Sequence, residues 1–128
     1  MNTAKNYDLS ILLIRITAGG LMLTHGFPKM MKLFAGGEIQ FADPIGIGMT
    51  ASLALAVFSE VICSFLVLVG YKTRWFAIPL AITMFIAAFV VHLSHPWAKK
   101  EMAIIYLLMY LALIISGSGK YSVDHKLK

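Results

Sequence analysis

Cysteine and charge are both scarce in this sequence, and each scarcity excludes a class of protein. The single cysteine, Cys63, excludes an internal disulfide, a Cys-x-x-Cys redox pair and a cysteine-rich metal site. Only 13% of the 128 residues are charged, against ~25% in an average soluble protein. Hydrophobic residues make up 59% and the mean hydropathy is +0.82. The composition predicts an integral membrane protein with a single domain over residues 1–128.

Acidic residues are also few, with six Asp and Glu against eleven Lys and Arg. Such an excess can indicate nucleic-acid binding, but these basic residues form short clusters between apolar runs rather than one charged face. We interpret them as signals of membrane topology. The expected partner is therefore the lipid bilayer, and no nucleic-acid partner is expected.

Four apolar segments approach the ~20 residues that a helix needs to cross a bilayer. They cover about residues 9–27, 49–69, 75–93 and 102–116. None has the alternating pattern of a barrel strand, so the predicted fold is all-α, an integral membrane four-helix bundle. The first segment is too long for a signal-peptide core and lacks a cleavage site, so we expect it to be retained. Pro28 is expected to bend or end its helix.

An even number of spans puts both termini on the same side of the membrane. That side would carry six basic residues: Lys5, Lys72, Arg74, Lys120, Lys126 and Lys128. The opposite side would carry four: Lys29, Lys32, Lys99 and Lys100. The positive-inside rule then predicts an N-in, C-in topology. The longest connection, residues 32–48, would lie along the outer interface or fold back over the bundle.

Two charged residues fall deep inside predicted spans, Arg15 in the first and Glu60 in the second. Small residues flank both at helical spacing, which is typical of a face that packs closely against another helix. An isolated ion in a bilayer is costly, so we expect Arg15 and Glu60 to form a buried ion pair. Such a pair either fixes the helix register or contributes directly to function.

A second polar cluster is expected near the outer ends of the spans, formed by His25, Lys29, His92 and Glu101. Chain direction brings these residues to one membrane level, where they can surround a shared ligand-binding pocket. The alternative is that their long side chains simply reach headgroup water. A metal would need three or four converging ligands, and the spacing of these residues has no metal-site signature, so we expect no metal site.

Four segments carry a resemblance to a known family: LLIRITAGGLMLTHGFPKMMKLF, SEVICSFLVLVGYKTRW, MFIAAFVVHL and EMAIIYLLMYLALIISGSGKYSVD. Over nearly its whole length the chain resembles the DoxX family of small bacterial membrane proteins. The matching positions are Arg15, His25, Gly26, Lys29, Glu60, Gly70, Thr73, Arg74, His92, Glu101, Gly117, Gly119, Tyr121, Ser122 and Asp124. One departure is visible, because family members often carry glycines where this chain has Cys63 and Ser64.

The resemblance implies a four-helix bundle in the bacterial inner membrane and a link to quinone-coupled sulfur oxidation, to oxidative-stress complexes or to quinone detoxification, among which the fold does not choose. Our leading hypothesis is a subunit of a redox system that binds a quinone or a similar apolar redox molecule in the outer pocket. His25, Lys29 and His92 would donate hydrogen bonds, and Glu101 would exchange a proton. The sequence shows no redox centre of its own, so a redox partner protein would move the electrons. Whether the chain is itself an enzyme or a homo-oligomer is left open.

Two other hypotheses come from different functional classes. The chain can be a small-solute carrier or channel subunit, with its path along Arg15, Glu60, His25 and Lys29, because such polar lines mark pathways in transporters. It can also be a structural assembly factor of a membrane complex, whose buried charges only hold the helices in register. A quinone that co-purifies with the protein would favour the first hypothesis over these two.

Overall fold

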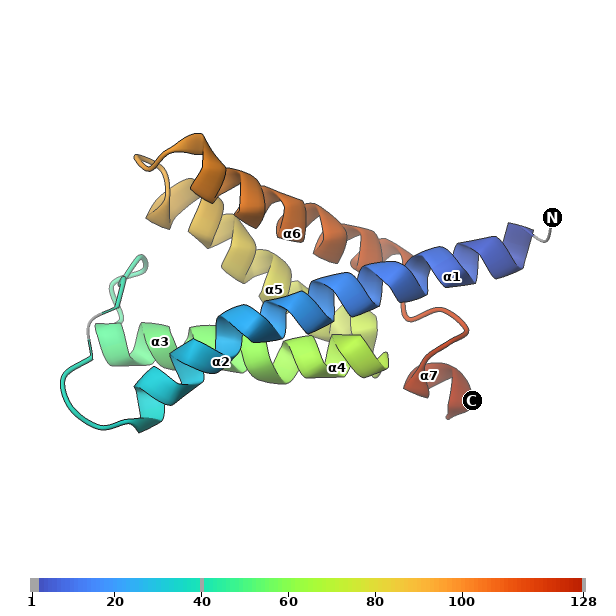
Figure 1. Cartoon of the computed structure of the whole chain (residues 1–128), viewed down its shortest axis with the longest axis horizontal. Coiled ribbons are helices and arrows are strands. Elements are labelled where there is room, and N and C mark those ends of the chain that lie inside the picture. Colours follow the sequence, from blue (N-terminus) through green and yellow to red (C-terminus); the bar gives the residue numbers. More distant parts are fainter. Residues whose placement is uncertain (1–2, 40, 128) are drawn as a thin grey trace.

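The computed structural model describes residues 3–39 and 41–127, which form four main helices (Figure 1). The first three each contain a π-helical segment, in which hydrogen bonds span five residues instead of four. The first helix comprises α1 (Thr3–Arg15), η1 (Ile16–Gly20) and α2 (Leu21–Phe34). The second comprises α3 (Met49–Val57), η2 (Phe58–Cys63) and α4 (Ser64–Val69). The others are α5 (Thr73–Ile86) with η3 (Ala87–Val91), α6 (Trp97–Ser116) and the short α7 (Val123–Lys126).

This arrangement confirms the predicted all-α fold and changes the bounds of three helices. The third covers Thr73–Val91 instead of 75–93, the fourth covers Trp97–Ser116 instead of 102–116, and the first is longer at both ends. That helix runs unbroken from Thr3 to Phe34, so of the two expected effects of Pro28, a bend or an end of the helix, the end is wrong. Proline removes one backbone hydrogen bond, and a long helix in a membrane protein tolerates that loss when its neighbours support it. The two termini lie at the same end of the bundle (Figure 1). Lys128, which was counted in the charge bias, lies outside the described residues.

Three of the described helices are long and apolar enough to cross a membrane: Thr3–Phe34, Met49–Val69 and Thr73–Val91. The fourth main helix, α6, is 20 residues long but carries Lys99, Lys100 and Glu101 in its first turns. Large apolar side chains such as those of Phe65 and Ile115 are exposed on the outside of the bundle, as expected for surfaces solvated by lipid.

Two glycines let the first helix approach the second at backbone distance. A Cβ added to Gly19 would lie 2.9 Å from the amide nitrogen of Leu68 in α4. A Cβ added to Gly26 would lie 2.7 Å from the carbonyl oxygen of Glu60 in η2. Close contacts of this kind, with small residues at the interface, are typical of helix pairs in membranes. The contact at Gly26 places the following turn of α2, which carries Lys29, beside Glu60.

Arg15 is buried at the end of α1 and joins three parts of the chain. Its guanidinium donates hydrogen bonds to the carbonyls of Val67 (3.1 Å), Leu68 (2.9 Å), Ser118 (3.1 Å) and Tyr121 (2.7 Å). The first two carbonyls belong to the last turn of α4, where backbone acceptors lack partners within the helix. Arg15 therefore ties α1 to the end of α4 and to the chain that follows α6.

The predicted ion pair between Arg15 and Glu60 is therefore wrong. Both side chains are buried as expected, at 2% and 1% exposure, but their partners differ. The guanidinium has five N–H groups in a rigid fork, which suits several carbonyls better than one distant carboxylate. Glu60 is instead paired with Lys29.

The closing Gly-x-Gly-x-Tyr-Ser-x-Asp segment packs at the same end as Arg15. Asp124 accepts hydrogen bonds from the backbone N–H of Lys72 (2.9 Å) and from the hydroxyl of Ser118 (2.6 Å). The hydroxyl of Ser118 also lies 2.8 Å from that of Thr73, at the start of α5. These contacts fasten the chain after α6 onto the turn between α4 and α5, so this family-like motif has a structural role here.

Candidate functional site

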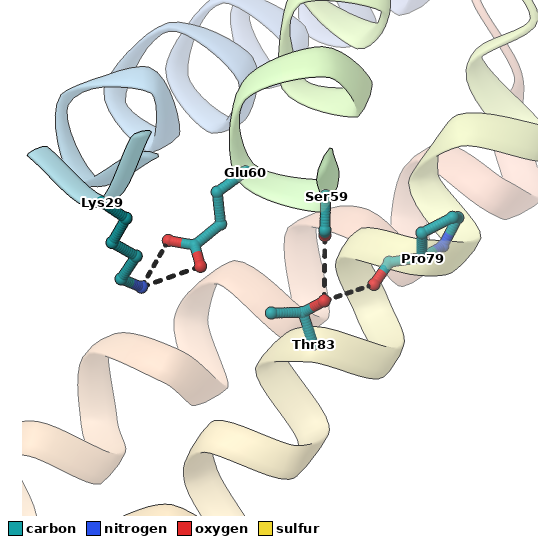
Figure 2. A network of polar contacts seen from close by, with 5 residues as sticks. All are labelled: Lys29, Ser59, Glu60, Pro79 and Thr83. Atoms are coloured by element: carbon teal, nitrogen blue, oxygen red, sulfur yellow. Dashed lines mark hydrogen bonds and ion pairs between the residues drawn. The ribbon is translucent and has the colours of Figure 1, made fainter. Parts of the chain in front are cut away.

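The most site-like feature of the molecule is the ion pair between Lys29 and Glu60. The Nζ of Lys29 donates to both carboxylate oxygens of Glu60, at 2.8 and 2.7 Å (Figure 2). Glu60 is almost fully buried, whereas the side chain of Lys29 is 33% exposed. A lysine ammonium has three N–H groups, and the pair uses two of them. The ammonium of Lys29 thus compensates the charge of the buried Glu60 carboxylate and keeps one N–H group that is not used in the pair.

A cavity of about 570 Å³ lies beside this pair, and we call it the ligand pocket. Its walls come from α2, α3, η2, α5 and η3, and from the loop that joins the first two helices. Its lining residues are Lys29, Phe41, Ala42, Pro44, Ile45, Ser52, Leu55, Ala56, Phe58, Ser59, Glu60, Pro79, Ile82, Thr83, Met84, Ile86, Ala87, Val91 and His92. A cavity of this size with mostly apolar walls and a few convergent polar groups is typical of a small-molecule site.

Two hydroxyl groups line the wall of the ligand pocket near Glu60. The hydroxyls of Ser59 and Thr83 lie 2.9 Å apart, and Thr83 donates to the carbonyl of Pro79 at 2.8 Å (Figure 2). Each hydroxyl has a single hydrogen, and the Pro79 carbonyl can only accept. Ser59 therefore donates to Thr83, and the lone pairs of Ser59 remain as an acceptor at the pocket wall.

The loop after α2 folds back over the ligand pocket, which agrees with one of the two predicted placements. Asp43 holds this loop in shape, accepting hydrogen bonds from the backbone N–H groups of Ile47 and Gly48 (both 2.9 Å) and from the hydroxyl of Ser52 (3.0 Å). Partial desolvation raises the pKa of Asp43, but the hydrogen bonds from Gly48, Ser52, Ile47 and Gly46 outweigh it and hold the pKa below its usual value.

The predicted outer cluster is divided by the structure. Lys29 and His92 both line the ligand pocket, and Glu60 joins them. His25 and Glu101, both described, lie outside its lining and are exposed. The ring of His25 packs edge-on against Tyr106 of α6, with 5.9 Å between ring centroids, so His25 faces a different neighbour from Lys29.

His92 lines the ligand pocket just after the end of η3. Its Nδ1 lies 2.8 Å from the Nδ1 of His95, so one of the two rings donates and the other accepts. Among residues 3–39 and 41–127, no group of three or more His, Cys, Asp or Glu side chains could hold a metal ion. The polar side chains that line the pocket, those of Lys29, Ser52, Ser59, Glu60, Thr83 and His92, can donate or accept hydrogen bonds.

Glu60 was not placed in the ligand pocket from the sequence, although two features of the sequence indicated that it pairs with Lys29. Glu60 needed a cation, and Lys29 lies one turn beyond Gly26, a glycine that can bring two helices into backbone contact. Lys29 was assigned instead to the outer cluster, and Glu60 to Arg15.

Comparison with known proteins identifies the family. The model of the DoxX family matches residues 10–93, about two thirds of the chain. The chain belongs to the DoxX family. The matched region contains the Lys29–Glu60 pair and all the lining residues of the ligand pocket, and it ends before α6.

Three relatives align with this DoxX protein over most of their length. A protein of Haemophilus influenzae, described as uncharacterized, is 28% identical over 98% of this chain and 97% of its own. A protein of Bacillus subtilis named "Putative oxidoreductase CatD" is 29% identical, over 94% of this chain and 88% of its own. An uncharacterized membrane protein of Mycobacterium tuberculosis is 33% identical, over 92% of this chain and 81% of its own. No solved structure matches the chain. The protein is a multi-pass membrane protein of this family.

Proposed function

We propose that this DoxX protein is the membrane subunit of a redox system and binds a quinone, or a similarly apolar redox molecule, in the ligand pocket. The observation that carries the proposal is the placement of a buried carboxylate and its partly exposed ammonium partner in the wall of a cavity that is otherwise mostly apolar. An apolar ring bearing carbonyl groups needs both features, because its body favours apolar walls and its oxygens require hydrogen-bond donors.

The rim of the ligand pocket suggests how such a molecule enters. Leu55, Phe58 and Ile82 line the pocket and are 53%, 42% and 56% exposed. They lie on helices long and apolar enough to cross the membrane, so their exposed surfaces face lipid tails. An apolar molecule dissolved in the bilayer can therefore reach the pocket sideways without passing through water.

The polar groups of the pocket support a role in proton exchange. Reduction of a quinone to a quinol adds two electrons and two protons. Lys29 can donate a hydrogen bond to one quinone oxygen, and the Lys29–Glu60 pair can supply one of the two protons and regain it later. His92, a further titratable residue in the pocket lining, can supply the second proton to the other oxygen. The electrons come from a separate redox protein in this proposal. The name of the Bacillus subtilis relative, "Putative oxidoreductase CatD", is consistent with such a role.

Binding to the purified protein in lipid nanodiscs tests this function. Equilibrium dialysis would measure the dissociation constant of a short-chain quinone for wild type and for Ile82→Trp, whose larger side chain fills part of the pocket. We expect Ile82→Trp to weaken binding at least about tenfold, because the filled volume is no longer open to the ligand. Ile78→Trp is the matched control, since Ile78 lies one turn earlier on α5, is exposed and is outside the pocket lining.

The control variant should bind the quinone as wild type does. Equal binding by all three proteins would place the quinone elsewhere on the molecule, and absence of binding by wild type would exclude the proposed ligand. Either result would overturn the proposal.

A further inference from the structure

A second cavity, of about 680 Å³, lies at the end of the bundle that carries both termini, and we call it the terminal cavity. Its walls come from α1, the start of α5, and the chain from the end of α6 to α7. Its lining residues are Tyr7, Asp8, Ile11, Lys72, Thr73, Arg74, Trp75, Ser116, Gly117, Ser118, Gly119, Lys120, Asp124 and His125. It shares no lining residue with the ligand pocket.

The basic side chains of the terminal cavity reach its surface, and each of its two acids accepts a backbone hydrogen bond. Asp8 accepts the backbone N–H of Lys120 at 3.2 Å, and Asp124 accepts that of Lys72 at 2.9 Å. The cations of the cavity are those of Lys72, Arg74 and Lys120, and all three residues are exposed. The Nζ of Lys72 lies over the ring of Tyr71, 5.5 Å from its centroid, a contact that leaves its N–H groups free to turn to an anion. Arg74 donates from Nη2 to a single carbonyl, that of Ile115, at 3.1 Å. Its other N–H groups can therefore contact an anion.

Lys72 holds an unfavourable backbone conformation at this place. Its φ of 44° is left-handed, and among the described residues it is the only non-glycine residue with a positive φ. Glycine would adopt this φ without strain. The backbone N–H of Lys72 is fixed by Asp124, so the strained turn holds the lysine beside the cavity. Backbone strain that retains a charged side chain is consistent with a binding role for that side chain.

The terminal cavity lies at the membrane boundary. Thr73 begins a helix that is apolar enough to span the bilayer, so Lys72 and Arg74 are at its water-facing end. Trp75 and Tyr7 also line the cavity and are 71% and 55% exposed. Exposed tryptophan and tyrosine at a helix end are typical of the lipid headgroup level. The cavity thus combines cations for a headgroup with aromatic surface for the glycerol and upper acyl region.

We propose that the terminal cavity binds the phosphate headgroup of an anionic phospholipid in the leaflet that both termini face. Lys72, Arg74 and Lys120 contact the phosphate, and Trp75 and Tyr7 contact the less polar part of the lipid. Basic pockets between membrane helices bind anionic headgroups in this way. The site does not depend on the function proposed for the ligand pocket, and either can be correct without the other.

Native mass spectrometry of the full-length protein tests this site. Wild type would be released from nanodiscs made of equal parts phosphatidylglycerol and phosphatidylcholine, and the retained lipids would be identified. We expect phosphatidylglycerol to be retained in preference to phosphatidylcholine. In the Lys72→Gln/Arg74→Gln variant, the preference should fall about fivefold for each cation removed. The matched control is Lys99→Gln/Lys100→Gln, which removes the same charge from the first turns of α6.

Three outcomes would overturn the proposal. One is equal retention of the two lipids by wild type, a result that needs no variant and does not depend on how the variants fold. Another is an equal loss of preference in the control variant, which would indicate a general effect of net charge. A third is full displacement of the retained phosphatidylglycerol when inorganic phosphate or glycerol phosphate is added to the mixed nanodiscs, which would identify the ligand as a soluble phosphate.

Discussion

Lys29 and Glu60 form a bidentate ion pair that joins the first two helices inside the ligand pocket, with the lysine Nζ 2.8 and 2.7 Å from the two carboxylate oxygens. Their side chains differ in environment, because Glu60 is buried and Lys29 reaches the surface in part. This asymmetry predicts different consequences when each partner is removed.

Lys29→Met should destabilise the protein by about 3 kcal/mol, because it leaves an uncompensated carboxylate in the interior. Glu60→Gln should cost less, about 1 kcal/mol, because the partly exposed ammonium of Lys29 can be hydrated once its partner is neutral. Reversible unfolding in mixed micelles would measure both free energies.

The double variant Lys29→Met/Glu60→Leu is the control for the pair, and it should recover most of the stability lost in Lys29→Met. If Lys29→Met leaves the free energy of unfolding unchanged, the pair makes no contribution and this prediction is wrong.

Gly26→Ala should separate the first two helices. The added methyl would lie 2.7 Å from the carbonyl oxygen of Glu60, which is backbone and cannot rotate away. We expect a loss of about 2 kcal/mol and weaker quinone binding. Gly20→Ala is the control, since its nearest neighbour would be a side-chain atom of Leu68 at 4.0 Å. Equal effects of the two substitutions on unfolding would contradict the close approach at Gly26.

Arg15→Met should destabilise the protein strongly while leaving the geometry of the ligand pocket intact in the molecules that fold. The substitution leaves the carbonyls of Val67, Leu68, Ser118 and Tyr121 without the donor they share, at a cost of about 3 kcal/mol or more. Arg15→Lys should recover only part of this, because one ammonium cannot reproduce the planar fork. A quinone dissociation constant that changes as much as the stability would instead place Arg15 in the binding site.

Much of the fold could be predicted from the sequence because lipid imposes simple rules on it. The length of the second apolar run predicted a span over residues 49–69, and the observed helix has the same bounds, Met49–Val69. The even number of predicted helices placed both termini at one end, as Figure 1 shows. The long loop was predicted either to lie along the outer interface or to fold back over the bundle, and its residues Phe41, Ala42, Pro44 and Ile45 line the ligand pocket.

The partners of the buried charges were harder to predict, for geometric reasons. The predicted helix faces assumed a rotation of 100° per residue, as in a regular α-helix. The π-helical segments η1 and η2 turn by a different angle, so the faces that carry Arg15 and Glu60 differ from the predicted ones. His25 and Lys29 lie on neighbouring parts of one helix surface, yet α2 contacts both η2 and α6, so His25 packs on Tyr106 and Lys29 pairs with Glu60. The carbonyls that bind Arg15 are backbone groups, and the pattern of side chains in a sequence does not show which backbone carbonyls are left without a helical partner.

The loop over the ligand pocket should lose order in acid. Because hydrogen bonds hold the pKa of Asp43 below its unfolded value of 3.8, its contribution is fully present above that pH and is lost as the pH falls towards the lower folded value. Hydrogen exchange at Ile47 and Gly48, compared with Asp43→Asn at each pH, would measure it. We expect wild type to be better protected at pH 6 and the two proteins to converge well below pH 4. Equal protection at pH 6 would show that the carboxylate does not hold the loop.

Photocrosslinking with an azido-quinone tests the central claim, that the ligand pocket binds an apolar redox molecule, most directly. The reagent would be activated in nanodiscs and the modified peptides identified by mass spectrometry, with excess unlabelled quinone as competitor. We predict competable labelling on peptides that contain Leu55, Phe58 and Ile82, which line the pocket. Labelling that is spread over the lipid-facing helices and resists competition, or that is confined to peptides containing Ile115 on α6, would contradict the claim.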